Sequence, residues 1–313
     1  MPTAGKSCHR RIHGDDASTD GVAMSVSTDA RGQMLAGLPI SRRRLNAAGI
    51  STAVFEAGEG PPLVLLHGGI ECGGAYWAPV IARLAEIHHI VVPDVPGLGE
   101  SAPADRLDVT MLADWFEDLL AQTHAERPML VAHSLLGSVA ARFAAGHDAL
   151  SRLVIYAAPG IAAYRMPAGL RYAAIRFSIS PTARNAERFE RFALFDLDAT
   201  RDRNAPWFDA FDAYTRSRAA VPHVKRTMRR LIGTGTKQIP DDELRRIKAP
   251  TTLLWGRHDR MVPLRLAEHA SEILRWPLHV VEDAGHAPHI EAPAAFLTAL
   301  SAIESSPPRR SAS

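Results

Sequence analysis

Short apolar runs alternate with segments of helical periodicity along most of this chain. Each run is rich in Val, Ile and Leu and has the length of one strand, whereas apolar residues between the runs recur at helical spacing. The predicted strands read PLVLL, IVV, MLVAH, LVIYAAP, TTLLWG and LHVVED. Two further strands that turn at Ala48 and Gly49 precede them. Such alternation favours a mostly parallel sheet with helices on both faces, which is an α/β fold.

One long segment interrupts the alternation. Residues 159–248 contain helical stretches rich in Arg and aromatic residues but no convincing buried strand. Because the segment lies between two core strands, we expect an inserted helical cap at one edge of the sheet. The core then comprises residues 41–158 and 249–304. Residues 1–40 are polar and aperiodic, which predicts a disordered N-terminal extension, and residues 305–313 are expected to form a flexible tail.

Composition excludes several classes of protein. The 36 basic and 34 acidic residues give a net charge of only +2, so we expect no nucleic-acid partner. The only cysteines, Cys8 and Cys72, form neither a disulfide framework nor a metal-ligand pattern. No GxGxxG follows the first core strand and no P-loop is present, so we expect no cofactor. Without a signal-like or membrane-spanning apolar run, a cytoplasmic protein is expected. The sequence leaves open whether it is a monomer or a dimer.

Polar residues stand directly after the predicted parallel strands, where ligands bind in open α/β sheets. Residues 67–69, His-Gly-Gly, follow the first core strand, and Asp94 follows the second. Ser134, Asp259 and His286 come after three later strands. A serine, an acid and a histidine at one sheet edge, beside a glycine-rich loop with free N–H groups, are the parts needed for acyl transfer through a covalent intermediate.

The residues around these strand ends resemble the α/β-hydrolase family over about residues 43–303. The matching stretches are HGG, PDVPGLGES, AHSLLG, WGRHDRMVP and AGHAPHIEAP. This resemblance implies that Ser134 is the nucleophile on a strand-to-helix elbow and that His286 is its base. It implies that Asp259 orients the imidazole.

The resemblance also implies that the backbone N–H groups of Gly69 and Leu135 form an oxyanion hole. One position departs from the family pattern, in which small residues stand two places before and two places after the nucleophile. Ala132 fits, but Leu136 does not, although Gly137 follows it. We expect the Leu136 side chain either to point away from the turn or to open it and displace the Leu135 N–H.

Each candidate also has a purely structural interpretation. Ser134 alone fits a helix N-cap, and Asp259 alone fits a surface turn. For three neighbouring residues we favour the structural interpretation: His133 packs beneath the elbow, His289 braces its own loop, and Asp94 fixes the loop that follows it.

A serine nucleophile argues against epoxide opening and dehalogenation, which proceed in this family through an aspartate. We therefore expect hydrolysis of a carboxylic ester or thioester of a small to medium, largely apolar substrate, roofed by aromatic residues of the cap. Hydrolysis of a carbon–carbon bond in a diketone-like substrate is the alternative within the same mechanism, and a cofactor-free perhydrolase is a further one. A ligand-binding protein with weak turnover is the alternative of another class, favoured only by Leu136.

Overall fold

The computed structural model describes residue 1 and residues 29–307. Within this part of the chain, one sheet of eight strands forms the centre of the fold. The strand order is β1-β2-β4-β3-β5-β6-β7-β8. β1 pairs with β2, and β2 with β4, in antiparallel fashion, and every other pairing is parallel. The bounds are β1 (Ser41–Ala47), β2 (Ile50–Ala57), β3 (Pro62–Leu66), β4 (His89–Pro93), β5 (Met129–His133), β6 (Arg152–Tyr156), β7 (Thr251–Gly256) and β8 (Leu278–Val281). The predicted mostly parallel α/β sheet is confirmed.

The sequence explains the two kinds of pairing. β3, β5 and β6 consist almost entirely of apolar residues because both faces of the sheet are covered there. β1 and β2 form the predicted hairpin, whose turn residues Ala48 and Gly49 both have positive φ angles, 48° and 78°. Positive φ at both turn positions matches the right-handed twist of the flanking strands.

Helices cover the sheet in two layers. α2 and α13 contact each other, and α3 and α4 contact each other, while α4 also packs on β5 and β6. Asp108 caps α3, where its side chain accepts a hydrogen bond from the Met111 N–H at 3.0 Å. The bounds of the core helices are η1 (Gly73–Trp77), α2 (Ala78–Leu84), α3 (Val109–Gln122), α4 (Ser134–Gly146), α11 (Arg265–Leu274), α12 (Pro288–Glu291) and α13 (Pro293–Ser305).

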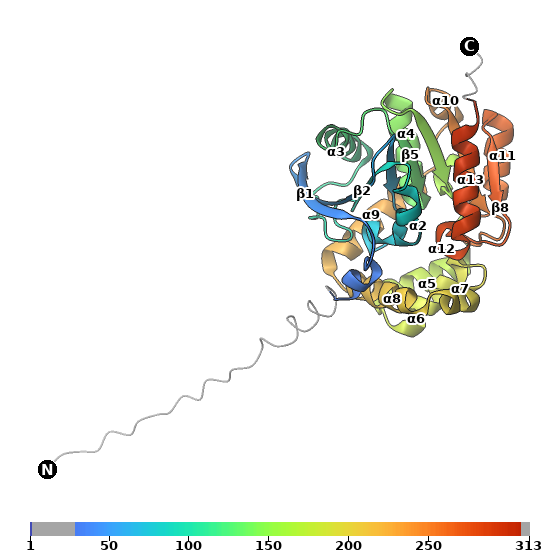
Figure 1. Ribbon diagram of the computed structural model, residues 1–313. Coiled ribbons are helices and arrows are strands. Elements are labelled where there is room, and N and C mark those ends of the chain that lie inside the picture. Colours follow the sequence, from blue (N-terminus) through green and yellow to red (C-terminus); the bar gives the residue numbers. More distant parts are fainter. Residues whose placement is uncertain (2–28, 308–313) are drawn as a thin grey trace.

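The chain between β6 and β7 is helical and contains no strand, in agreement with the predicted insertion. Its helices α5 to α8 gather at one end of the sheet (Figure 1), and α9 packs against α4. We call helices α5 to α9 the cap. The bounds of the segment are η2 (Pro159–Ile161), α5 (Ala168–Ile179), α6 (Ala183–Ala193), α7 (Leu197–Arg203), α8 (Ala205–Ala219), α9 (Pro222–Gly235) and α10 (Asp241–Leu244). The exact domain boundaries stay a prediction.

The N-terminal segment differs from the expectation. Residues 29–34 are helical, and Ala30, Met34 and Leu35 are buried against the core. The prediction of disorder is therefore wrong for residues 29–40, because these few apolar side chains and a buried arginine find partners that lie far along the chain. The remainder of the predicted extension, residues 2–28, lies outside the described residues.

The C-terminal helix α13 continues to Ser305 and packs on β8 and α2. Residues 308–313 of the predicted flexible tail lie outside the described residues. Within the part of the chain that the structure covers, no helix combines the length and apolar character needed to cross a membrane.

Candidate active site

Ser134 lies at a sharp turn between β5 and α4. Its φ angle is 53°, a conformation that non-glycine residues rarely adopt. The turn brings two other positions close together, since a Cβ at Gly137 would lie 2.7 Å from the carbonyl oxygen of Ala132. The tight approach therefore falls at Gly137, and Leu136 instead buries its side chain in the main hydrophobic core with 1% exposure. Of the two outcomes expected for Leu136, the structure has the one in which its side chain points away from the turn.

Ser134, His286 and Asp259 form one hydrogen-bonded chain. His286 Nε2 lies 2.9 Å from Ser134 Oγ, and His286 Nδ1 lies 2.7 Å from Asp259 Oδ2. The three residues are 9%, 4% and 6% exposed, which leaves the serine the most accessible of them. An ionised Asp259 accepts a hydrogen bond from Nδ1–H and so leaves the lone pair of Nε2 facing the serine hydroxyl.

Asp259 is itself fixed by the loop that follows β7. Its second oxygen, Oδ1, accepts hydrogen bonds from the backbone N–H groups of Met261 and Val262, both at 2.8 Å. With both carboxylate oxygens engaged, the side chain has a single orientation toward His286.

The glycine-rich loop after β3 lies directly against the elbow. A Cβ at Gly68 would lie 3.1 Å from Ser134 Cβ, and a Cβ at Gly69 would lie 2.5 Å from Leu135 Cδ1. The chain can approach the serine this closely only because these residues lack side chains. Leu135 stands in the first turn of α4, where backbone N–H groups have no partner within the helix. The two candidate oxyanion residues, Gly69 and Leu135, thus lie side by side next to Ser134.

The loop that carries His286 is held from two sides. The His286 N–H donates to the carbonyl oxygen of Ala193 in the cap at 2.6 Å, and the His286 carbonyl oxygen lies 2.9 Å from His133 Nε2. Burial keeps the pKa of His133 well below its usual value, with a smaller contribution from His286. His133 is therefore a neutral residue beneath the elbow, as predicted, and in addition binds the histidine loop.

Glu291 is a residue of this site that the sequence did not single out. Its Oε1 accepts hydrogen bonds from the N–H groups of Gly285 and Ala287 at 2.9 and 3.2 Å, and its Oε2 accepts one from the N–H of Phe195 in the cap at 2.6 Å. Burial raises the pKa of Glu291 to about 7, although these N–H groups act in the opposite direction. Its one sequence signal was an acid at the end of the matched stretch AGHAPHIEAP.

The other two residues for which we favoured a structural interpretation have supporting contacts. His289 is fully buried, and its Nδ1 lies 3.0 Å from the Tyr156 hydroxyl. Burial lowers the pKa of His289 to about 3, so its ring is neutral. Asp94 accepts hydrogen bonds from the N–H groups of Gly74 and Glu100 at 2.6 and 2.8 Å, which ties together two loops at the carboxyl end of the sheet.

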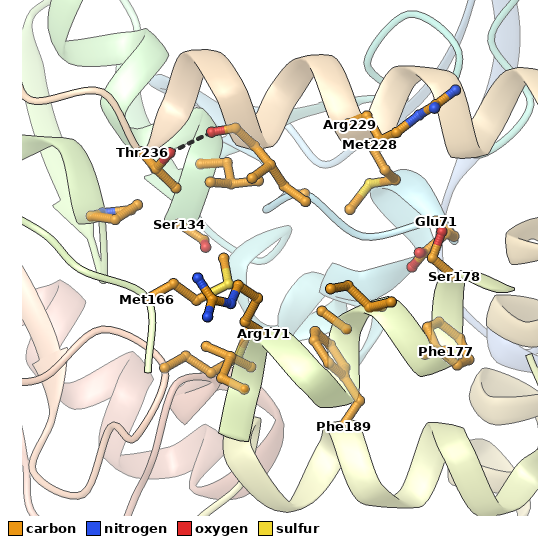
Figure 2. Close-up of a pocket in the computed structure, with 18 of the residues that line it drawn as sticks. Glu71, Ser134, Met166, Arg171, Phe177, Ser178, Phe189, Met228, Arg229 and Thr236 are labelled. Atoms are coloured by element: carbon orange, nitrogen blue, oxygen red, sulfur yellow. Dashed lines mark hydrogen bonds between the residues drawn. The ribbon is translucent and has the colours of Figure 1, made fainter. Parts of the chain in front are cut away.

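A cavity of about 910 Å³ opens at Ser134 between the core and the cap. Figure 2 shows its wall, with Met228 on one side and Phe177 and Phe189 on the other. Most lining side chains are apolar, which agrees with the expected apolar pocket. Of the cap aromatics, Tyr164, Phe177 and Phe189 reach this cavity. Among the described residues, no group of three His, Cys, Asp or Glu side chains is arranged to hold a metal ion.

Comparison with known proteins gives consistent results. The sequence model of the alpha/beta hydrolase family matches residues 63–299. A pimeloyl-[acyl-carrier protein] methyl ester esterase of Vibrio atlanticus is 30% identical over 261 residues, which cover 78% of this chain and 94% of that protein. A 2-hydroxymuconate semialdehyde hydrolase of Pseudomonas sp. strain CF600 is 28% identical over 264 residues, covering 81% and 90%. The crystal structure of carboxylesterase CesB from Bacillus subtilis superposes with a TM-score of 0.76 at 22% identity, covering 91% and 99%.

Proposed function

The chain belongs to the alpha/beta hydrolase family, and from that premise we propose that it is a serine hydrolase that cleaves a carboxylic ester or thioester. The observation that carries this proposal is the hydrogen-bonded chain from Ser134 through His286 to Asp259 at the end of a large apolar cavity. Esterases among its relatives and structural neighbours support it.

In the proposed reaction the Ser134 hydroxyl attacks the ester carbonyl carbon while His286 Nε2 takes its proton. Asp259 stabilises the resulting imidazolium, and the N–H groups of Gly69 and Leu135 donate hydrogen bonds to the oxyanion of the tetrahedral intermediate. The imidazolium then gives its proton to the departing alcohol or thiol, which leaves an acyl-enzyme. A water molecule, deprotonated by His286, hydrolyses that ester and restores Ser134.

The cap would define the substrate, because it supplies most of the cavity wall beyond the core loops. The lining residues from α5 and α9 include Leu170, Ala174, Phe177, Met228 and Ile232. A surface of this kind binds an apolar group by burial, at about 25 cal/mol per Å² of apolar area. We therefore propose a small to medium, largely apolar substrate.

Hydrolysis of a carbon–carbon bond is the second candidate. The similarity to 2-hydroxymuconate semialdehyde hydrolase favours it, as does the glycine-rich loop beside Ser134. A binding protein without turnover is less well supported, because Leu136, the residue that suggested it, is packed in the core and leaves the candidate triad hydrogen-bonded.

Labelling and turnover test the proposal together. A fluorophosphonate probe should label the wild type and not Ser134→Ala, and p-nitrophenyl esters of graded chain length should reveal the preferred acyl length. His286→Ala should lower ester turnover by several orders of magnitude, because triad members act as a unit. His269→Ala, which changes an exposed histidine on α11, serves as the control.

Wild-type turnover in the His286→Ala variant would eliminate the proposed base. Rapid cleavage of a diketone, with no activity on any ester, would favour the carbon–carbon hydrolase. A folded protein that neither reacts with the probe nor cleaves any of these compounds would favour a binding protein.

A further inference from the structure

Two chambers meet at Ser134. The large apolar cavity lies on one side, and a second chamber of about 90 Å³ lies between the glycine-rich loop and helices α6 and α8 of the cap. Ser134, His286 and Gly69 line both chambers, so a substrate bound at the serine can place one part in each. A volume of about 90 Å³ has room for a group of a few heavy atoms, since a water molecule in the liquid takes about 30 Å³.

Glu71 lines both chambers and places a carboxyl group in walls that are otherwise mostly apolar. It follows Ile70 in the glycine-rich loop, and Figure 2 shows it across the cavity from Ser134. Among the described residues, no cation and no other side chain forms an ion pair or hydrogen bond with its carboxyl group. Only its own backbone N–H lies in reach, and burial raises the pKa of Glu71 to about 7.

Glu190, on α6, lines the small chamber from the cap side. The residue is 8% exposed, and its Oε2 has no hydrogen-bond partner within the described part of the chain. The nearest cation, Arg201 Nη2, is 3.7 Å from that oxygen, beyond hydrogen-bonding distance. Burial raises the pKa of Glu190 to about 7 as well. Thr215 of α8 adds a hydroxyl group to the same wall.

The buried Oε2 of Glu190 is costly without a hydrogen-bond partner unless a ligand satisfies it, and the half-buried Glu71 carboxyl group stands in the same chamber wall. We propose that the small chamber is a subsite for a compact substrate group that donates hydrogen bonds to Glu71 and Glu190, namely a hydroxyl or an amine. This inference rests on the proposed ester hydrolysis at Ser134 and specifies its substrate. The apolar remainder of the substrate lies in the large cavity.

The charges around the large cavity agree with this orientation. Arg171, Lys225 and Arg229 line it, and no acidic side chain of the described residues forms an ion pair with any of them. Glu71 lines both chambers, but Glu190 lines only the small one and the three cations line only the large one. An anionic group should therefore be less favoured in the small chamber than in the large one. A carboxylate and a hydrogen-bond donor should prefer different chambers.

The test uses p-nitrophenyl esters of four acyl groups that have equal length and end in CH₃, OH, NH₃⁺ or CO₂⁻. The acyl group is small enough for the small chamber, whereas the p-nitrophenyl group is not. For the wild type we expect kcat/KM of the OH or NH₃⁺ ester to exceed that of the CH₃ ester about tenfold, and the CO₂⁻ ester to be the poorest substrate. Glu71→Leu should abolish the preference.

Glu71→Gln separates the two kinds of donor. Its amide oxygen still accepts a hydrogen bond from a hydroxyl, but its lost charge should weaken selection of NH₃⁺ specifically. Glu190→Gln should weaken the same preference from the cap side. Glu187→Gln, on the exposed face of α6 and outside both chambers, is the matched control and should retain the wild-type order.

The inference is overturned if the CH₃ ester is the best substrate of the wild type, or if Glu71→Leu retains the wild-type preference. If no ester is cleaved, the proposed function fails separately, and binding still tests the subsite. In that case the dissociation constants of the four matching p-nitroanilides are measured on the Ser134→Ala variant. Equal constants for all four end groups would refute the subsite, and tighter binding of the OH or NH₃⁺ compound would support it.

Discussion

Ser134 is held at a φ angle of 53°, a conformation that costs of order 1–3 kcal/mol for a residue with a side chain. The surrounding fold maintains it. β5 below the serine is completely buried, and α4 behind it is buried along most of its length. Ala132 and Gly137 provide the space in which the chain reverses, since their backbones approach closely. This strain positions the Ser134 hydroxyl in front of His286.

Leu136 is expected to contribute to stability and not to the chemistry at Ser134. Its side chain is 1% exposed and belongs to the main hydrophobic cluster. Leu136→Ala should lower the free energy of unfolding by about 2–5 kcal/mol, as for other buried leucines, and leave kcat on a p-nitrophenyl ester nearly unchanged. Denaturant unfolding and steady-state kinetics measure the two effects. A large loss of kcat at unchanged stability would show that Leu136 acts on the elbow after all.

Among the secondary-structure elements, two parts of the cap contact the candidate site. The end of α6 and the segment after it bond to the histidine loop: the Ala193 carbonyl oxygen accepts from the His286 N–H, and the Phe195 N–H donates to Glu291. α9 packs its last turn on the start of α4, at Leu135. The first contact involves the candidate base, His286, and the second involves the candidate oxyanion donor, Leu135.

Glu291 is expected to hold the histidine loop to the cap. A glutamine has only one acceptor oxygen, so Glu291→Gln must place an NH₂ group against backbone N–H donors of Gly285, Ala287 or Phe195. We expect kcat to fall about tenfold or more with little change in KM, because His286 loses its position while the cavity remains. The free energy of unfolding should fall by about 1–3 kcal/mol.

The matched control for Glu291→Gln is Glu282→Gln, which changes an exposed carboxylate that follows β8 and pairs with Arg257 at 2.7 Å. Its kinetics and stability should stay close to those of the wild type. Equal kcat values for Glu291→Gln and the wild type would show that the loop keeps His286 in place without the glutamate.

Gly235, the last residue of α9, is expected to set the position of the Leu135 N–H. A Cβ at Gly235 would lie 2.8 Å from the Leu135 carbonyl oxygen and 2.9 Å from its Cα, so an alanine there must displace backbone. Loss of one oxyanion donor costs on the order of 10²–10³ in rate. Because Gly235→Ala displaces this donor without removing it, kcat should fall by about tenfold or more.

Gly233→Ala on the same helix is the control for Gly235→Ala. A Cβ at Gly233 would meet no atom within 4 Å, and this variant should keep full activity and gain about 0.5–1 kcal/mol of stability from its better helix propensity. If both variants retain the wild-type kcat, the contact between α9 and Leu135 has no bearing on catalysis.

For the whole molecule, the rule that ligands bind at the carboxyl ends of parallel strands predicted more of the candidate site than local sequence patterns did. Ser134, Asp259 and His286 were identified because each follows a strand of a parallel sheet, and the topology brings such ends together. Glu71 and Glu291 were missed because burial and missing partners, which give a carboxyl group its chemistry, depend on three-dimensional contacts. The order of residues 29–40 was missed for a similar reason: the partners of Arg31 are 63 and 183 positions away.

Arg31 is expected to join the N-terminal segment, the core and the cap into one cooperative unit. Its guanidinium, 3% exposed, lies 2.8 Å from Asp94 Oδ2 and 2.8 Å from the Tyr214 hydroxyl of α8. Breaking a buried ion pair by removing one partner costs about 3–5 kcal/mol, because the other charge stays buried without compensation. Arg31→Ala should therefore lower the free energy of unfolding by about that amount, measured by chemical denaturation.

Two shortened variants separate this ion pair from the effect of the preceding residues. A variant that begins at Met24 keeps Arg31 and is the reference for the second. A variant that begins at Met34 lacks it and should lose at least as much stability as Arg31→Ala, because Ala30 is also removed from the core. The loss should come with a higher KM for long-chain esters, since α8 of the cap loses its hydrogen bond to Arg31. Equal unfolding free energies for the two shortened variants would show that the buried Arg31–Asp94 ion pair does not stabilise the protein.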